Sequence, residues 1–270
     1  MNSLLLAVVV IFWLVVAYRW YGGLIDRHIV KPDDSRTPPS CELYDGVDYC
    51  PGNRTIVFGH HFSSIAGAGP IIGPVAAVAA FGWGASILWI ALGVVFFGAV
   101  HDYVSLMISV RHGGKSLPDI AKEVVGKRAR LLFILFVWFA LILIIAVFAV
   151  VASRTLESTP QIVIPTFALI PIAALFGWSP FRSRLPVVVG TLFSLGLLAL
   201  SIYLGYLHPV SLPYGGDAAF ATWMALLIAY AFIASVLPVW VLLQPRDYIS
   251  TWVLVIGMLL GFVGLAITRP

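Results

Sequence analysis

Apolar runs of roughly 20 residues recur along the whole chain, and they constrain the fold more than any other feature. A run of that length matches one helical crossing of the hydrocarbon core of a bilayer. Of the 270 residues, 61% are hydrophobic and 10% are charged, whereas a soluble domain has about 25% charged residues. We therefore predict an all-α, polytopic membrane helix bundle that forms a single transmembrane domain over residues 1–270.

Eight segments have the length and composition of membrane-spanning helices. They are predicted at residues 3–18, 57–81, 85–110, 130–152, 161–177, 185–206, 218–243 and 249–268. The first, at 3–18, lacks a basic start and a small-residue cleavage site, so we interpret it as an extra leading helix rather than a signal peptide. Two charged loops, 19–56 and 111–129, are the long connections, and the others are short.

The basic residues predict which loops face the cytoplasm. If alternate connections share a side, the loops 19–56, 111–130, 178–184 and 244–248 fall together and carry 14 of the 16 Lys and Arg residues. Only Arg154 and Arg269 fall on the other side. Because cytoplasmic loops carry an excess of Lys and Arg, we place both long loops in the cytoplasm. An even number of spans then puts both termini outside it. The same bias explains the net charge of +4 without a nucleic-acid partner.

The stretch VFGHHFSSIAGAGPIIGP, residues 57–74, places helix breakers inside a predicted span. The interruption comprises Gly67, Ala68, Gly69 and Pro70. Such an interruption survives in a membrane only where protein or a water-filled cavity covers it. Close helix packing through small residues also explains the glycines. With Pro70 and Pro74 following, a discontinuous helix is the better interpretation.

Polar side chains lead into this interruption. The helical spacing i, i+3, i+4, i+7 places on one face His60, Ser63, Ser64 and Gly67. His61 points about 100° away from that face. The histidines could simply be hydrated near the cytoplasmic end, but histidine is also the side chain that titrates near neutral pH. We therefore take His60 and His61 as candidates for proton coupling.

The third predicted span contains His101 and Asp102 within FFGAVHDYVSLM. An aspartate at the centre of a membrane helix costs about 2.5–3.5 kcal/mol on insertion scales and often marks an ion or proton route. The alternative is a structural aspartate that bonds the free amides of a broken helix. We add His101 and Asp102 to the coupling candidates, and we expect Asp102→Asn to abolish coupled uptake without preventing insertion.

A second interruption is predicted from Ser235 to Pro238, inside the span 218–243, because an interior proline frees a backbone carbonyl. Segments two and seven cross the membrane in opposite directions, and paired interruptions in inverted repeats mark a transporter site at the midplane. Residues 57–206 would then be a first five-helix repeat and 218–268 the start of a second, inverted one. The predicted substrate-binding residues are Gly67, Ala68, Gly69, Pro70, Ser63, Ser64, Ser235 and Pro238.

Four blocks of the sequence resemble the carbon starvation protein A (CstA) family. They are DGVDYCPGNRTIVFGHHF, FGHHFSSIAGAGPIIGP, GAVHDYVSLMISVRHGGKSL and VLLQPRDYIS, in the family's order up to about residue 251. The resemblance implies a transporter of the inner (cell) membrane that takes up peptides under carbon starvation. For some relatives it implies carriage of pyruvate with protons. It also implies a LeuT-type inverted-repeat core, which agrees with the pairing of the two interruptions.

The resemblance also implies that several further spans follow in family members, so the inverted-repeat core is incomplete in these 270 residues. A second membrane chain that supplies the missing helices, self-association, or a fragment of a longer chain would each account for this. We therefore expect as partners the lipid bilayer, a peptide or small-carboxylate substrate, a coupling proton or cation, and either a second membrane chain or another copy.

The leading functional hypothesis is thus a secondary active, proton- or cation-coupled peptide transporter. The alternatives are a symporter of pyruvate or another small carboxylate with protons and, from a different class, a non-transporting subunit that responds to nutrient status. A bis-histidine haem carrier built from His60, His61, His101 and His112 is disfavoured, because adjacent histidines cannot bind one metal from a regular helix.

We expect no enzymatic activity, no cofactor and no metal. The chain has no H-E-x-x-H pair of the kind that binds a catalytic metal. Cys41 and Cys50 lie nine residues apart in the first long loop, without a paired histidine. Such cysteines are most often plain thiols, although a disulfide or half of a metal site stays possible on spacing alone.

Overall fold

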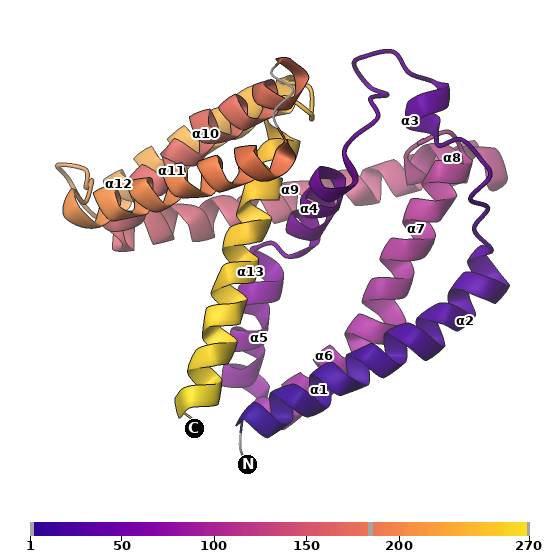
Figure 1. The fold of residues 1–270 in the computed structure, drawn as a ribbon, viewed down its shortest axis with the longest axis horizontal. Coiled ribbons are helices and arrows are strands. Elements are labelled where there is room, and N and C mark those ends of the chain that lie inside the picture. The colour runs from indigo at the N-terminus through magenta and orange to yellow at the C-terminus, as the bar shows by residue number, and fades with distance from the viewer. Residues whose placement is uncertain (1–2, 183–185, 269–270) are drawn as a thin grey trace. The chain divides into compact units, whose positions relative to one another are not determined.

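The computed structural model describes residues 3–182 and 186–268, and every regular element in these residues is a helix (Figure 1). Within them, eight helices are long and apolar enough to cross a membrane. The prediction of an all-α protein with eight membrane segments is therefore confirmed. The chain divides into two compact units, and each is described by itself. Unit 1 comprises residues 1–51, 68–138 and 258–270, and unit 2 comprises 52–67 and 139–257.

The first three membrane segments are composite helices. They consist, in chain order, of α1 (Ser3–Ala17), η1 (Tyr18–Gly22), α2 (Gly23–Ile25) and η2 (Asp26–Val30); of α4 (Arg54–Ile65) and α5 (Ala68–Phe81); and of α6 (Trp83–Gly93), η3 (Val94–Ala99) and α7 (Val100–Arg111). The later elements are α9 (Lys127–Ser158), η4 (Pro160–Ile162), α10 (Val163–Arg182), α11 (Val187–Leu207), α12 (Asp217–Val236) and α13 (Leu243–Thr268). Two short helices, α3 (Pro39–Glu42) and α8 (Leu117–Val124), lie in the connections.

The leading helix of unit 1 is longer than predicted. Helical structure continues to Val30, so residues 19–30 are not part of a loop. Turns of π geometry at η1 and η2 carry the helix through this polar stretch. Lys31, with a left-handed backbone (φ 48°), ends it. The Arg111 guanidinium then donates hydrogen bonds to the carbonyls of Val30 and Lys31, which satisfies the free end of the helix.

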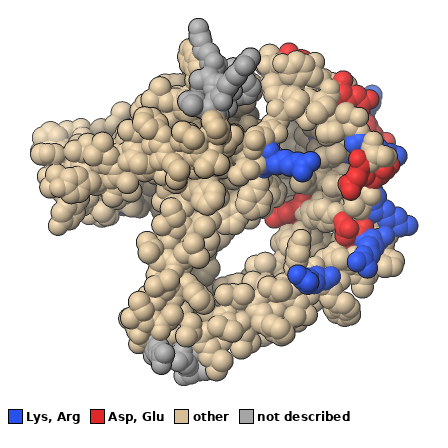
Figure 2. All heavy atoms as spheres, in the orientation of Figure 1, with Lys and Arg blue, Asp and Glu red and all other residues tan. Residues whose placement is uncertain are grey.

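The connection that follows is ordered by side chains rather than by regular structure. The Asp45 carboxylate accepts hydrogen bonds from the backbone N–H groups of Val47, Asp48 and Tyr49. These bonds, that of Tyr49 first, lower the pKa of Asp45. The Tyr49 hydroxyl donates to the Gly113 carbonyl at 2.8 Å, which ties this loop to the turn after α7. Figure 2 shows that acidic and basic side chains of unit 1 gather around this end.

The second membrane segment is broken as predicted. Helix α4 ends at Ile65, Ala66 and Gly67 are not helical, and α5 begins at Ala68. Gly69 and Pro70 therefore lie in the first turn of α5, where the missing proline N–H costs no helical hydrogen bond. The boundary between the two units also falls between Gly67 and Ala68.

The second predicted interruption is wrong in its position. Helix α12 ends at Val236, Leu237 has an extended backbone as expected before a proline, and Pro238 lies in a connecting turn. Ser235 and Pro238 thus mark the end of a helix rather than a break inside the span 218–243. The predicted loop at 244–248 is also wrong, because α13 begins at Leu243. Pro245 lies in the first turn of α13, where proline is favoured.

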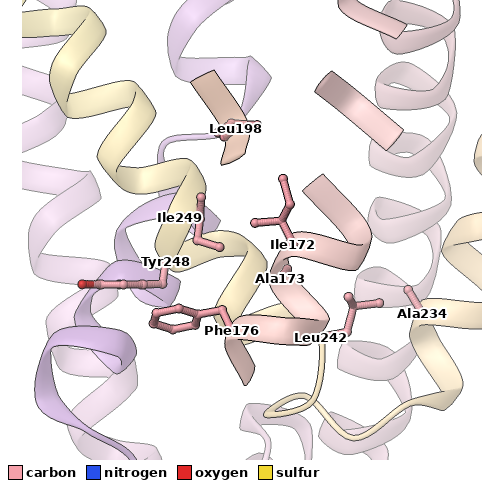
Figure 3. Close-up of a cluster of buried hydrophobic side chains, with 8 residues drawn as sticks. All are labelled: Ile172, Ala173, Phe176, Leu198, Ala234, Leu242, Tyr248 and Ile249. Carbon is pink, nitrogen blue, oxygen red and sulfur yellow. The ribbon is translucent and has the colours of Figure 1, made fainter. Parts of the chain in front are cut away.

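The first turns of α13 are held in the core of unit 2 (Figure 3). Phe176 of α10 stacks on Tyr248 of α13 with ring centroids 5.4 Å apart. Ile249 and Ala173 have no exposed surface. The buried core cluster comprises Ile172, Ala173, Phe176, Leu198, Ala234, Leu242, Tyr248 and Ile249. Close packing of this kind fixes the direction of the polar side chains that lie between these apolar ones.

Candidate functional site

A hydrogen bond between a half-buried histidine and a buried aspartate joins α4 to α13 within unit 2. The ring nitrogen Nδ1 of His60 lies 2.8 Å from Oδ2 of Asp247, although the two residues are 187 positions apart in the chain. The side chain of Asp247 is 11% exposed and that of His60 is 29% exposed. Because a carboxylate only accepts hydrogen bonds, Nδ1 carries the hydrogen in this contact. Protonation of the ring at Nε2 then makes the contact a salt bridge.

The other carboxylate oxygen of Asp247 is bound by Arg246. The guanidinium contacts Oδ1 through Nε at 3.1 Å and through Nη2 at 2.9 Å. Its third nitrogen, Nη1, donates to the Tyr230 hydroxyl of α12 at 3.0 Å. Arginine stays charged at any physiological pH. Asp247 therefore keeps a counter-ion whether His60 is neutral or charged.

The two helices approach closely because residue 59 is glycine. A Cβ atom at Gly59 would lie 2.7 Å from Cδ2 of Tyr248, closer than real Cβ contacts, and 3.0 Å from its Cα, which is tighter than most. The Thr251 hydroxyl donates to the Gly59 carbonyl at 2.7 Å and also bonds the Asp247 carbonyl. The Tyr248 hydroxyl is bonded to Thr191 Oγ1 of α11 at 2.9 Å. The adjacent His60 is consequently brought within reach of Asp247.

The bond from Thr251 to α4 is the basis of a stability prediction. Thr251→Val keeps the shape of the side chain but removes its hydrogen bond to Gly59, so we expect a loss of about 1 kcal/mol. The control is Thr155→Val, because that exposed hydroxyl bonds only the carbonyl one turn before it on its own helix. Thermal unfolding of the purified protein in detergent measures both. Equal midpoints for the two variants would contradict the role given to Thr251.

The residues of the predicted polar stripe have different surroundings. His60 and Ser63 are half-buried, whereas Ser64 and His61 are exposed. The Ser64 hydroxyl donates to the His60 carbonyl at 2.7 Å. Gly67 ends unit 2 at the helix break, and Gly69 and Pro70 are exposed in α5 of unit 1.

The other predicted site residues lie elsewhere. His101 and Asp102 are neighbours on α7 in unit 1, with Nδ1 and Oδ1 3.2 Å apart and side chains 73% and 37% exposed. The exposed Ser235 donates to the Phe232 carbonyl at 2.8 Å on its own helix. Of the predicted coupling residues, His60 is the one that the structure joins to a carboxylate on another helix.

Sequence reasoning missed the partners of His60, namely Asp247, Arg246, Tyr230 and Thr251. The cause was the assignment of 244–248 to a loop, where charged residues need no explanation. Two signals were present. Proline at position 245 is compatible with a helix start. Asp247 and Thr251 are also spaced i, i+4, which puts them on one face of a helix.

Metal-binding groups do not gather in the described part of the chain. No three His, Cys, Asp or Glu side chains there are placed to hold one ion. Cys41 and Cys50 are free thiols.

These observations define a multi-pass membrane protein in which His60 of α4 is hydrogen-bonded to the buried Asp247 of α13. The chain belongs to the carbon starvation protein CstA family, whose sequence model matches residues 2–270. The resemblance stated above is thus confirmed. Two of the blocks that carried it, FGHHF and QPRDYIS, are the two that meet at His60 and Asp247.

Several curated relatives are similar over most of this chain. The peptide transporter CstA of Mycobacterium tuberculosis (strain CDC 1551 / Oshkosh) is 39% identical over 95% of the chain and 34% of its own length. The peptide transporter CstA of Escherichia coli (strain K12) is 36% identical over 100% of the chain and 39% of its own length. The pyruvate/proton symporter BtsT of the same strain is 38% identical over 95% of the chain and 36% of its own length. The chain therefore spans little more than a third of the length of these relatives. No solved structure matches it significantly.

Proposed function

We propose that the protein is a secondary active transporter of the cell membrane that takes up peptides together with protons. The ion pair between His60 and Asp247 is the observation that carries this proposal, because it offers a titratable group at a contact between two membrane helices. The peptide assignment rests on the relatives that are peptide transporters by name. The proposal includes cytoplasmic placement of the loop that follows Val30 and extracytoplasmic termini.

Coupling follows from the charge of the site. With His60 protonated, the attraction between two opposite charges adds to the hydrogen bond that holds α4 against α13. With His60 neutral, only the hydrogen bond to the carboxylate remains, and it is weaker by that Coulomb attraction. Proton release therefore loosens α4. A proton that enters from outside would favour the tighter contact between α4 and α13. Its release to the cytoplasm would favour the looser one.

The proposed substrate segment is the helix break that follows His60 on the same helix. Gly67, Ala68, Gly69 and Pro70, with Ser63 and Ser64, remain its candidate residues. Free amides at the start of α5 suit a carboxylate group, and carbonyls at the end of α4 suit a cation. A shift of α4 at its contact with Asp247 would reach this segment within about two helical turns. Under a LeuT-type arrangement the break would lie near the midplane.

A second candidate substrate is pyruvate, because a relative of 38% identity is named a pyruvate/proton symporter. Pyruvate is an anion without an amino group. It therefore needs a partner for its carboxylate, whereas a zwitterionic peptide also needs a partner for its ammonium group. Competition separates the two. Excess pyruvate should leave the uptake of a labelled tripeptide unchanged if the protein is a peptide transporter. If pyruvate is the substrate, labelled pyruvate should accumulate and the labelled tripeptide should not.

The experiment that tests proton coupling uses proteoliposomes with an inward proton gradient and a labelled tripeptide. We expect accumulation by the wild type, and loss of accumulation in His60→Gln because glutamine forms the hydrogen bond but cannot bind a proton. The matched control is His61→Gln, since His61 is exposed on the same helix. The predicted effect of Asp102→Asn is measured in the same assay. Accumulation by His60→Gln at the wild-type level would refute the proposed coupling role.

The remaining hypotheses have their own readouts. A non-transporting nutrient-response subunit would bind a peptide without moving it in either direction. A second membrane chain, or a second copy, would raise the native mass of the purified protein above that of one chain.

A further inference from the structure

We propose that unit 1 contains a separate binding site for a short zwitterionic peptide, in the cavity between the leading helix and the third membrane segment. The cavity has a volume of about 770 Å³, which is in the range of small-molecule sites. Its wall is formed on one side by α1, η1, α2 and η2, and on the other by η3 and α7. This inference shares the substrate class of the proposed function, but it concerns other residues and has its own readout.

Backbone geometry singles out this cavity. Three helical segments in the described residues have π geometry, namely η1, η2 and η3. Each of them contributes to the wall, for example through Tyr18, Asp26 and Val94. Turns of π geometry are rare and occur frequently at functional sites. Their convergence from two facing helices on one cavity is an observation independent of its charges.

Asp26 gives the cavity an uncompensated negative charge. Its carboxylate accepts a hydrogen bond from the Tyr103 hydroxyl of α7. Among the described residues, no Lys, Arg or His nitrogen forms an ion pair with it. Arg111 of α7 instead donates to the carbonyls of Val30 and Lys31 at the end of η2. A carboxylate without a counter-ion on a membrane helix is costly, so a ligand ammonium group is a fitting partner.

Arg19 supplies the opposite charge in the same wall. It forms no ion pair with a described acidic residue. Arg19 and Asp26 are seven residues apart, which is about 10 Å along a helix. An extended tripeptide has about the same length. The carboxylate of such a peptide would reach Arg19 while its amino group reaches Asp26.

The wall between the two charges suits peptide side chains. It is formed by small and apolar residues, including Ala17, Val95, Ala99 and Val100, and by Tyr21. Tyr21 is fixed by an edge-to-face contact with Phe96, with ring centroids 5.1 Å apart. Two opposite charges separated by an apolar wall match a zwitterion better than a simple anion or a lipid chain. A lipid chain would leave both charges without partners.

The test is photo-crosslinking of the purified full chain with a tripeptide that carries a photoreactive central residue, followed by peptide mapping with mass spectrometry. We expect labels within residues 14–26 or 94–103. Trialanine should compete for them, whereas trialanine blocked by N-acetylation or C-amidation should compete at least about tenfold more weakly, as expected for the loss of a charged hydrogen bond. Asp26→Asn and Arg19→Gln should each reduce labelling by a similar factor. Arg27→Gln, a change on the same helix outside the cavity wall, should not.

The outcomes separate this site from the coupling site. His60→Gln should keep the labels in unit 1 even if it loses proton-driven uptake, and that result would leave both proposals standing. Labels confined to other parts of the chain would overturn the site. Labelling of the cavity that persists unchanged in Asp26→Asn and Arg19→Gln would also overturn the site. The same holds if blocked trialanine competes as well as free trialanine does. Circular dichroism melting of each variant shows that the protein is folded.

Discussion

Asp247→Asn is expected to abolish proton-driven accumulation of peptide and to lower stability. Asparagine keeps the shape of the side chain but removes the charge that binds both His60 and Arg246. Removing one partner of a fully buried pair costs about 3–5 kcal/mol. Because the Arg246 side chain is 31% exposed, we expect a smaller loss, about 2–3 kcal/mol. Thermal unfolding and proteoliposome uptake measure the two effects.

The matched control for this change is Asp217→Asn. Asp217 is also an aspartate near the start of a membrane-length helix, but it is exposed. Its substitution should cost no more than the loss of a favourable helix-dipole interaction, about 0.3–1 kcal/mol, and should leave uptake intact. If Asp217→Asn and Asp247→Asn had the same effect on uptake, the loss would reflect a general change of charge and not the ion pair.

Gly59→Ala is expected to be the most destabilising single-methyl change on α4. The added carbon would meet Tyr248 at its ring and at its backbone, and the backbone atom cannot move aside as a side chain does. Overpacking of this kind costs about 1–3 kcal/mol. In a chain of this size each kcal/mol lowers Tm by about 2–4 °C. The displacement of α4 should also lengthen the contact between His60 and Asp247 and reduce uptake.

Gly196→Ala provides the comparison, because a Cβ atom at that position on α11 meets nothing within 4 Å. Alanine is favoured over glycine in a helix by about 0.5–1 kcal/mol, so the Tm of this variant should stay unchanged or rise. A fall in Tm as large as that of Gly59→Ala would mean that helix packing against Tyr248 is not the reason for glycine at position 59.

The sequence allowed the membrane segments to be predicted well, because apolar length is a local property. It also located the break before α5, since glycine and proline act on their own turn of backbone. Errors arose where polar residues lie inside helices. The stretch 19–30 continues the first helix through π turns, and 244–248 begins α13. Charge at these positions suggested loops, whereas tertiary partners such as Tyr103 and His60 make helical structure possible there.

Of the two residues in the central contact of the site, only one could be predicted from the sequence. His60 was recognisable because a histidine within a broken apolar helix is unusual. Its partner Asp247 was not, because their contact depends on the packing of α4 against α13, and that packing depends on Gly59, Tyr248 and Thr251 together. No pattern within either segment encodes a contact over 187 positions. His101 and Asp102 are adjacent in the chain, yet their side chains are exposed and form no buried site.

The central claim, that proton movement through the pair of His60 and Asp247 accompanies peptide movement, is tested most directly by measuring both fluxes at once. Proteoliposomes that contain the protein and a trapped pH-sensitive dye receive labelled trialanine outside, without an imposed proton gradient. We predict that the lumen acidifies as the peptide enters through the wild type, and that Asp247→Asn shows no acidification. Entry of peptide through the wild type without acidification, or equal acidification by Asp247→Asn, would contradict the claim.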